Sequence, residues 1–318
     1  MRTLAVVNMV VLAAAGAWLA TLTLPIKQAL RVRNAFLLRR GEDDDFGWTP
    51  ARVPHHFRTE RKQPPESIAA AVHNAGMAEI ASDWTRALAI VELLIRHNKA
   101  DAPIRADLAT TYSGILAGRG YCADYVRVFL AAAPVAGLFC RQWAFSFDGF
   151  GSHGHTVVEI WDRQHSQWRL LDVHNNVYAV KAGTEEPLDA LAVRDALCVV
   201  PQALEFVQAA PGRLGFRYPH KLIDYYRRGA GEWYLWFGND VVSRERSGFL
   251  GLVARVSPPL AHRLASVVSG GPLLVVATTP DNVPAIRRME ALRRRVTIVA
   301  GLIVSLIALL VLQGIRHV

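Results

Sequence analysis

The chain has 318 residues, 52% of them hydrophobic and 20% charged, and its 36 Lys and Arg against 27 Asp and Glu give a formal net charge of +9. This length is enough to bury a substantial core, and the composition excludes a disordered or collagen-like protein. The small and odd number of cysteines, three, excludes a scaffold held together by disulfides. A basic excess would ordinarily suggest nucleic acid, but its distribution along this chain argues against that partner.

Two apolar segments bracket the chain and predict transmembrane helices over 4–25 and 296–315. The first has no charged residue, and its 22 residues, rising about 1.5 Å each, match the roughly 30 Å hydrocarbon core of a bilayer. The second begins with a charge-free run of 17 residues, the short end of the spanning range. Ala15-Gly16-Ala17 leaves a cleaved signal peptide as the alternative for the first segment. A buried core helix is the alternative for both.

Ten basic residues beside these segments account for the net charge. Residues 26–40 carry five bases and no acid, and residues 287–295 carry five bases and one acid, so the remainder is formally neutral. The positive-inside rule therefore places both basic juxtamembrane segments, and the chain between them, in the cytoplasm at an inner or plasma membrane. A periplasmic or extracytoplasmic domain is the alternative. The expected partner is the lipid bilayer, with no nucleic acid, and membrane proteins stay open as further partners.

The middle of the chain predicts a soluble domain over 67–200. Residues 26–66 are assigned to the basic juxtamembrane segment and a linker, because Gly, Pro and acidic residues replace any apolar period after residue 40. Helical periodicity predicts helices over 67–98, 108–116 and from Tyr121 to Pro134. Aromatic and alternating segments predict strands over 138–147, 155–161 and 167–173. Helices followed by antiparallel strands predict the α+β class.

Beyond residue 180 the pattern is weaker. Residues 190–199 fit a helix or a strand, and 273–277 is too short to span a membrane. Seven aromatic side chains lie between 218 and 237, which we interpret as an element that covers the core, with an aromatic belt at the membrane surface as the alternative. We treat 201–286 as a C-terminal extension of the soluble domain without an assigned function.

Cys122 stands where a glycine-containing loop, beginning at Gly120, enters a predicted helix. The helix dipole at that end favours the thiolate, and the first backbone N–H groups can bind an oxyanion. Taken alone, a cysteine is more often a small buried apolar residue, and Cys140 and Cys198 are interpreted in that way. Cys122 therefore needs partners elsewhere in the sequence before it can be considered a nucleophile.

Two partners lie on a predicted antiparallel hairpin around the turn 162–165. We place His155 opposite Asp172 and Glu159 opposite Trp168, with all four side chains on one face of the sheet. A slip of one residue would send them to opposite faces. In this register Asp172 orients the imidazole of His155, which deprotonates Cys122. The arrangement is a Cys-His-Asp nucleophilic triad.

These motifs resemble the transglutaminase-like superfamily, of which the chain looks like a membrane-anchored, bacterial-type member. The family pattern reads Gly-x-Cys, Gly-x-x-x-Arg, His-x-x-x-Glu and Trp-x-x-x-Asp. It is met here, within about 70–180, by Gly120/Cys122, Gly137/Arg141, His155/Glu159 and Trp168/Asp172. Two features depart from the family. Val173-His174 replaces the Pro and Thr that commonly follow the Asp, and the upstream side-chain oxyanion donor has only Trp84, Tyr112 and Tyr121 as candidates.

The resemblance implies a papain-like core, in which a helix bearing the cysteine packs on an antiparallel sheet bearing the histidine and aspartate. It also implies acyl chemistry through a Cys122 thioester on a protein, peptide or amide substrate, as in a cysteine protease, amidase or acyltransferase. His155 and Asp172 complete the catalytic set, and no cofactor or metal is expected. Four residues are expected to support the site: Gly120, Arg141, Glu159 and Trp168.

Two other interpretations stay open. A catalytically idle transglutaminase-like domain could serve as a membrane-tethered binding or scaffold module. A metal site is the second, because four histidines fall close together in sequence, but no Cys or carboxylate spacing of a known site accompanies them. These histidines are His153, His155, His165 and His174.

Overall fold

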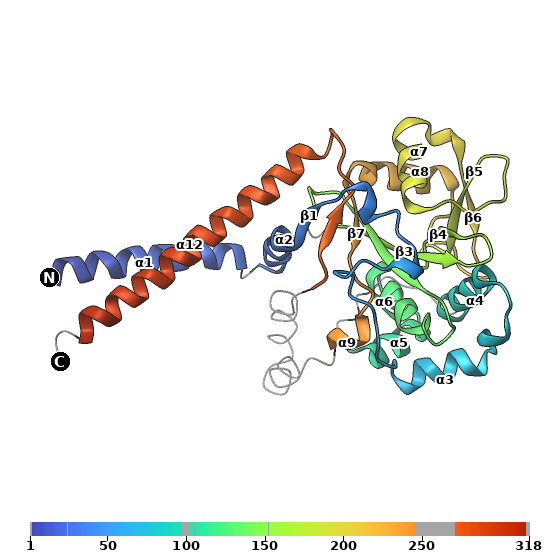
Figure 1. Cartoon of the computed structure of the whole chain (residues 1–318), viewed down its shortest axis with the longest axis horizontal. Helices are drawn as coiled ribbons and strands as arrows, with labels where there is room; N and C mark the ends of the chain where they lie inside the picture. The colour runs from blue at the N-terminus through green and yellow to red at the C-terminus, as the bar shows by residue number, and fades with distance from the viewer. Residues whose placement is uncertain are drawn as a thin grey trace.

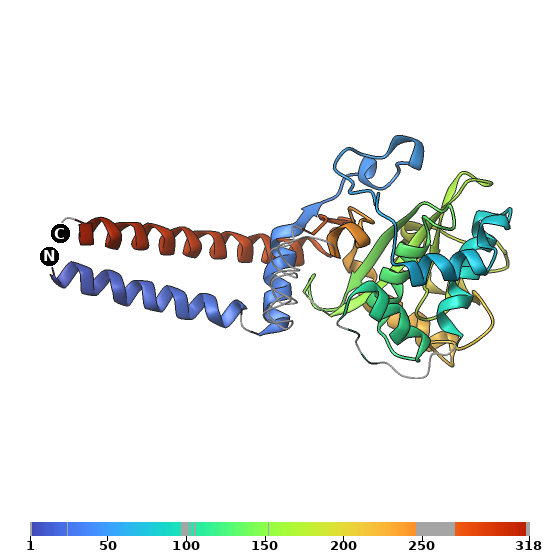
Figure 2. The same ribbon diagram turned by 90° about the horizontal axis from the view of Figure 1, so that it is seen from below.

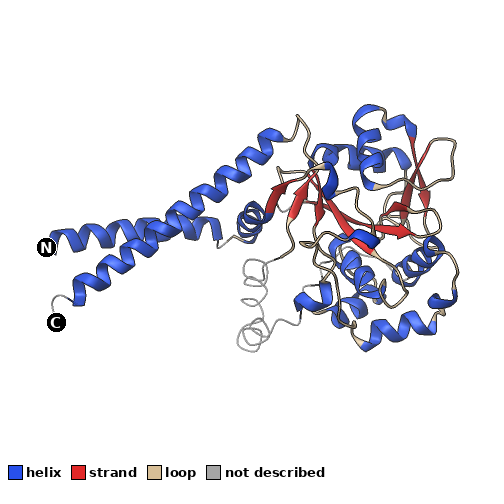
Figure 3. Ribbon diagram, in the orientation of Figure 1, coloured by secondary structure: helices blue, strands red, loops and turns tan. Residues whose placement is uncertain are grey.

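The computed structural model describes residues 2–23, 25–96, 102, 104, 106–151, 153–245 and 271–315. Its centre is a six-stranded sheet in the order β1-β8-β7-β2-β3-β4, antiparallel except for the parallel pair β1–β8, beside a two-stranded sheet β5-β6 (Figures 1 and 3). The strands are β1 (Leu38–Arg40), β2 (Cys140–Ser146), β3 (Gly154–Asp162), β4 (Gln167–Leu171), β5 (Val177–Lys181), β6 (Leu204–Gln208), β7 (Trp233–Trp236) and β8 (Leu274–Val276). Helices cover both faces, which confirms the predicted α+β class.

Helices fill one side of the central sheet. Val158 and Ile160 point from β3 into the cluster that these helices bury. The helix predicted over 67–98 is interrupted, because Gly76 adopts a left-handed φ of 62° and Ser82 caps a new helix by accepting a bond from the N–H of Thr85; residues 97–98 lie outside the described part. The helices are α3 (Glu66–Asn74), α4 (Asp83–Ile95), α5 (Leu108–Leu116), α6 (Cys122–Ala132) and α9 (Val241–Glu245).

The opposite face of the sheet carries aromatic side chains, as the alternation of a pleated strand requires. Phe145 and Trp143 of β2 and Trp233 of β7 pack there against α7 (Ala190–Val199) and α8 (Pro219–Gly229), on the other side of the sheet from α3–α6 in Figure 1. Segment 190–199 is thus a helix, capped by Asp189 through the N–H of Ala192 at 2.8 Å. Five short 3-10 turns complete the fold: η1 (Asp43–Asp45), η2 (Pro50–Arg52), η3 (Met77–Glu79), η4 (Pro201–Ala203) and η5 (Ala230–Glu232).

Segments outside the predicted domain contribute to its central sheet. The basic juxtamembrane segment supplies β1, and the C-terminal extension supplies β7 and β8, which lie between β1 and β2 in the sheet. The three residues of β8 are completely buried, which explains an apolar run too short for a membrane. Within the extension, 246–270 lies outside the described residues.

The predicted register of the central hairpin is wrong by two residues. Glu159 pairs with Leu170, and Trp161 pairs with Trp168. The reason is that the four-residue turn lies at 163–166, one residue later than the predicted 162–165, with Ser166 at a φ of 53°. Because side chains alternate with a period of two, a displacement of two leaves every side chain on its predicted face. His155 and Asp172 therefore keep the same side, with Asp172 just beyond the end of β4.

Two long helices extend together away from the globular part. They are α1 (Arg2–Thr23) and α12 (Val283–Ile315), which run side by side with both chain ends at the far tip (Figures 1 and 2). Among the described residues, one helix, Val283–Gln313, is by itself long and apolar enough to cross a membrane. The α1 segment meets that criterion only jointly with α2 (Ile26–Leu37), from which a bend of 95° separates it.

A third hydrophobic cluster joins these helices to the sheet. Ala35 from α2 and Ile286 and Met289 from α12 pack with Phe150, which is completely buried. Outside this cluster, Arg40 of β1 forms a bidentate ion pair with Glu290 of α12 at 3.0 and 3.1 Å. The globular part is therefore held in one orientation relative to the two long helices.

Candidate active site

Cys122 is the first residue of α6 and lies half-buried at the mouth of a cleft. The chain turns into the helix at Gly120, whose φ of 117° is strained for any residue with a side chain, and a Cβ there would lie 3.1 Å from the ring of Tyr125. Asp124 fixes the entry by accepting bonds from the N–H groups of Tyr121 at 2.9 Å and Ile104 at 3.1 Å. The thiol thus stands at a helix N-terminus, where partial positive charge favours an anionic sulfur.

His155 and Asp172 form a buried pair beside this thiol. Nε2 of His155 lies 2.7 Å from Oδ2 of Asp172, and the two side chains are 3% and 2% exposed. Asp172 is itself fixed, since Oδ2 also accepts bonds from Nδ2 of Asn175 and from the hydroxyl of Tyr226, both at 2.6 Å. Oδ1 accepts the N–H of Asn175 at 3.0 Å. With Nε2 held by the carboxylate, Nδ1 is the ring nitrogen left for Cys122.

The charges of the three groups reinforce one another. Burial by itself would lower the pKa of His155, but the Asp172 carboxylate and Cys122, through charge and hydrogen bonding, raise that pKa to about 10. Burial would raise the pKa of Asp172, but His155 and the surrounding hydrogen bonds lower it to about 2. At neutral pH the site therefore holds a carboxylate and an imidazolium next to the sulfur. Such a neighbour favours the thiolate, which is the nucleophilic form of cysteine.

Three of the four expected supporting residues, Arg141, Glu159 and Trp168, form a separate buried cluster on the same sheet face. Nε of Arg141 lies 2.5 Å from Oε2 of Glu159, and its guanidinium lies 3.9 Å from the ring centre of Trp168. Trp168 donates to the carbonyl of Trp48 at 2.8 Å, and Glu159 accepts the N–H of Ala190 at 2.8 Å. These contacts attach the sheet to the N-terminal segment and to α7, so they stabilise the scaffold that carries the histidine.

Cys122 and His155 open into a cleft of about 710 Å³. Its walls come from α2, the start of α6, the strands β2, β3 and β7, and the loops that follow β4 and β6. The described lining residues include Leu30, Arg33, Asn34, Tyr121, Cys122, Gln142, Ser146, His153, His155, Thr156, His174, Asn175, Arg213, Phe216, Tyr225, Tyr234 and Trp236. A cleft of this size can hold a substituted amide or a short peptide segment.

Of the three candidates for a side-chain oxyanion donor, the structure places only Tyr121 at the cleft. Trp84 stacks edge-on against Tyr178 at 5.2 Å, and Tyr112 is buried in the helical core. The cleft also contains Gln142, whose amide nitrogen donates to the hydroxyl of Thr156 at 2.9 Å. Sequence reasoning missed Gln142, because a single polar residue in a strand gives no signal of its own.

Other site residues come from the segments to which no role was assigned. Tyr226, the partner of Asp172, lies in α8, and Arg213 lies in the loop after β6. The dense group of aromatics between 218 and 237 was the sequence signal for Tyr226, and its interpretation as a core-covering element agrees with the complete burial of this side chain. No sequence signal distinguished Arg213 from an ordinary surface arginine.

The remaining thiols and histidines lie in different settings. Within the described part of the chain, no group of three His, Cys, Asp or Glu side chains could hold a metal. His165 pairs with Asp162 at 2.9 Å at the hairpin turn. Cys140 is buried in the core, where burial raises its pKa, whereas Cys198 is exposed near the end of α7. The interpretation of Cys198 as a core residue is wrong, because a helix turns it away from the face that packs.

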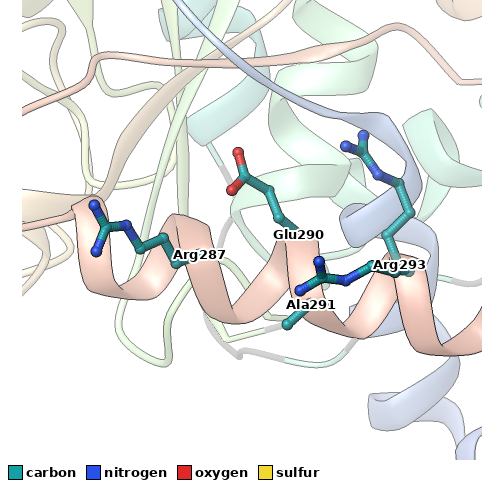
Figure 4. Close-up of a pocket in the computed structure, with 5 residues that line it drawn as sticks. Arg287, Glu290, Ala291 and Arg293 are labelled. Atoms are coloured by element: carbon teal, nitrogen blue, oxygen red, sulfur yellow. The ribbon is translucent and has the colours of Figure 1, made fainter.

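A shallower pocket of about 420 Å³ lies on the juxtamembrane part of α12 (Figure 4). It is lined by Arg287, Glu290, Ala291, Arg293 and Arg294 and contains no nucleophile.

Compared with known proteins, the chain matches no family model, no curated protein and no solved structure.

Proposed function

We propose that this protein is a membrane-anchored cysteine enzyme of transglutaminase-like type that cleaves or transfers the acyl group of an amide or peptide. The observation that carries the proposal is the position of His155, which interacts with Asp172 on one side and with Cys122 on the other. A buried imidazole between a carboxylate and a thiol at a helix N-terminus is the arrangement that activates a cysteine nucleophile. A module that only binds would have no need of it.

The reaction follows from the positions of these groups. The Cys122 thiolate attacks the substrate carbonyl carbon, and the N–H groups at the start of α6, with Tyr121 or Gln142 nearby, bind the developing oxyanion. The C–N bond then breaks while His155 gives its proton to the leaving amine nitrogen. A water molecule or a second amine next attacks the thioester carbon and passes a proton back to His155. The C–S bond breaks, and the thiolate is restored with the acyl group on the acceptor.

The proposal extends to a papain-like core. Two features support it: α6, which begins at the cysteine, packs on β3, and the histidine and aspartate come from β3 and the segment directly after β4. In such a core the sheet sets the distance between base and nucleophile. The strands β7 and β8 from the far end of the chain would then be additions to the edge of that core.

We also propose that α1 is a second transmembrane helix and that the globular part faces the cytoplasm. Side-by-side packing of α1 with α12, and the position of both chain ends at the same tip, support a two-pass arrangement (Figure 2). The ten bases beside the two helices lie at the opposite ends of those helices, nearest the globular part, as the positive-inside rule requires for a cytoplasmic domain. The bilayer, a protein, peptide or amide substrate and neighbouring membrane proteins are the proposed partners.

Alkylation of the full-length protein in detergent tests the nucleophile. At pH 6 we expect iodoacetamide to modify Cys122 more than about tenfold faster than Cys198, because only Cys122 has an imidazolium beside it. Cys198 is the internal control, since partial burial raises the pKa of its otherwise exposed thiol. His155→Ala should slow Cys122 to the rate of Cys198, measured by peptide mass spectrometry. Slow alkylation that His155→Ala leaves unchanged would contradict the proposal and leave the binding module.

A further inference from the structure

We infer that the substrate of this site carries a negatively charged phosphate or carboxylate near the scissile carbonyl and is presented from the membrane surface. The inference rests on the proposed function, because it names the substrate class of the same cleft. Four features of the cleft carry it: an arginine on α2, a second arginine on the loop after β6, the absence of carboxylates from its described lining, and the position of α2.

Arg33 brings an uncompensated charge to the cleft wall. No ion pair joins it to any Asp or Glu in the described residues; its Nε and Nη2 donate instead to the neutral amide oxygen of Asn34 at 3.1 and 2.8 Å. Its guanidinium also lies 5.5 Å from the ring centre of Trp236. Burial lowers the pKa of Arg33, and no carboxylate offsets the cost of removing this cation from water. An anionic ligand would supply that partner.

Arg213 repeats the pattern in the loop after β6. One of its terminal nitrogens donates to the carbonyl of His174 at 3.1 Å, while its buried Nε has no hydrogen-bond partner in the described structure. As with Arg33, no ion pair links it to a carboxylate of the described chain. A planar guanidinium with an unused donor is well suited to phosphate or carboxylate.

The described lining of the cleft contains arginines and no carboxylate. Among its described lining residues none is Asp or Glu, whereas two are arginines and three are histidines. The nearest acid of the catalytic set, Asp172, is engaged by His155, Asn175 and Tyr226 behind the surface. A cleft whose described lining supplies arginines and no carboxylate attracts an anionic substrate and disfavours a cationic one.

The position of α2 points to the membrane. This helix follows α1 after a bend of 95°, contacts both α1 and α12, and supplies Leu30, Arg33 and Asn34 to the cleft (Figure 2). Nδ2 of Asn34 donates to the carbonyls of Phe150 (3.1 Å) and Gly151, so α2 is also bonded to the loop that precedes β3. A helix lying across the end of a transmembrane helix lies at the headgroup level. One wall of the active site is therefore part of the membrane surface.

Charge selectivity can be measured with two small reagents on full-length protein in phosphatidylcholine vesicles, in a Cys198→Ser background. In both reagents the Cys122 sulfur attacks the CH₂ carbon and iodide leaves, but iodoacetate is anionic and iodoacetamide is neutral. We expect the rate ratio of iodoacetate to iodoacetamide at Cys122 to fall by roughly threefold to tenfold in Arg33→Gln and in Arg213→Gln. Arg31→Gln, the same change on the same helix but outside the cleft, is the matched control and should keep the ratio.

Charge-retaining variants keep this test decisive if a glutamine variant does not fold. Arg33→Lys and Arg213→Lys should preserve most of the ratio. An unchanged ratio in both glutamine variants, or a loss equal to that in Arg31→Gln, would overturn the anionic substrate. These results can be told apart from a failure of the proposed function. In that case the alkylation of Cys122 by iodoacetamide would itself be slow and would not change in His155→Ala.

The membrane source is tested with N-iodoacetyl phosphatidylethanolamine mixed into the same vesicles, against water-soluble N-iodoacetyl phosphoethanolamine. Both reagents carry a phosphate and the same electrophile, but only the first is held in the bilayer. We expect the lipid-borne reagent to label Cys122 in the protein with all its cysteines and to leave exposed Cys198 unlabelled. Labelling by the soluble reagent alone would overturn the membrane source and identify a soluble anion. Equal labelling of both thiols by the lipid would also overturn it.

Discussion

At the scale of single residues, the site depends on the hydrogen bonds that the Asp172 carboxylate accepts. Its Oδ2 accepts bonds from an imidazole, an amide and a phenol, and its Oδ1 accepts a backbone N–H. A buried carboxylate held by four donors stays ionised and keeps the histidine in one orientation. Of these donors only His155 was foreseen from sequence. Asn175 follows by three residues and Tyr226 by 54, and neither spacing is typical of a triad.

Removal of the phenol should therefore weaken the pair without breaking it. Tyr226→Phe takes one charge-assisted bond from Asp172, and we expect a loss of about 1.5–3 kcal/mol in the free energy of unfolding. Its Cys122 alkylation should also shift in pH dependence, since the pKa of Asp172 rises when a donor is lost. Tyr218→Phe, an exposed tyrosine at the start of the same helix, is the control and should change neither measurement. Equal effects of both changes would contradict this role.

The same pair predicts how stability depends on pH. The pKa of His155 is raised from 6.5 to about 10, so its contribution is complete below about pH 6.5 and is lost as pH rises toward 10. The pKa of Asp172 is lowered from 3.8 to about 2, so its contribution is complete above about pH 3.8 and is lost as pH falls toward 2. The midpoint of thermal unfolding in detergent should be highest between these limits. In the double variant His155→Gln with Asp172→Asn the profile should be flatter, and an identical profile would contradict the assignment.

At the scale of elements, the loop-to-helix junction at Gly120 positions the nucleophile and the hairpin positions the base. The predicted start of α6 agrees with the structure, because a glycine-containing loop and an apolar period mark it locally. The hairpin register was wrong by two residues, because the sequence does not determine whether the four-residue turn is 162–165 or 163–166, and moving a turn by one residue changes the register by two. The face was still correct, since a displacement of two preserves alternation.

The junction can be tested by adding one carbon. Gly120→Ala forces an alanine into a φ of 117° and places its Cβ against Tyr125, so we expect a loss of about 1–3 kcal/mol in stability and slower Cys122 alkylation at pH 6. Gly183→Ala is the matched control, because its φ of 76° carries a similar strain while no atom lies within 4 Å of the new Cβ. That control should lose stability and keep the thiol reactive. Unchanged reactivity in Gly120→Ala would show that the junction does not position the sulfur.

At the scale of the whole molecule, the globular part is packed against the long helices, which under the proposed function would place the active site next to the membrane. Phe150, in the loop before β3, packs in one cluster with residues of α2 and α12, and Arg40 bonds Glu290. The loop that carries the rim of the cleft is thus attached to both juxtamembrane helices. This packing does not provide a hinge between the two long helices and the cleft.

The side of the membrane is open to a direct test. Alkaline phosphatase folds only where disulfides form, so a fusion after residue 45 should be inactive and a fusion to the C-terminal end should be active. Immunoblots of both fusions control for their expression. The opposite pattern would place the globular part outside the cytoplasm and contradict the positive-inside prediction.

The sequence by itself determined the features that depend on neighbours along the chain: the α+β class, the start of α6, the hairpin strands and the common face of His155 and Asp172. These follow from capping, period and alternation, which are local. Only the tertiary structure decided which distant segments complete the site. Tyr226, Arg213 and Arg33 lie outside the motif region, and β1, β7 and β8 enter the sheet from segments taken as a basic juxtamembrane segment and an extension. These segments come together because residues far apart in the chain are buried against one another, and no local sequence pattern predicts such contacts.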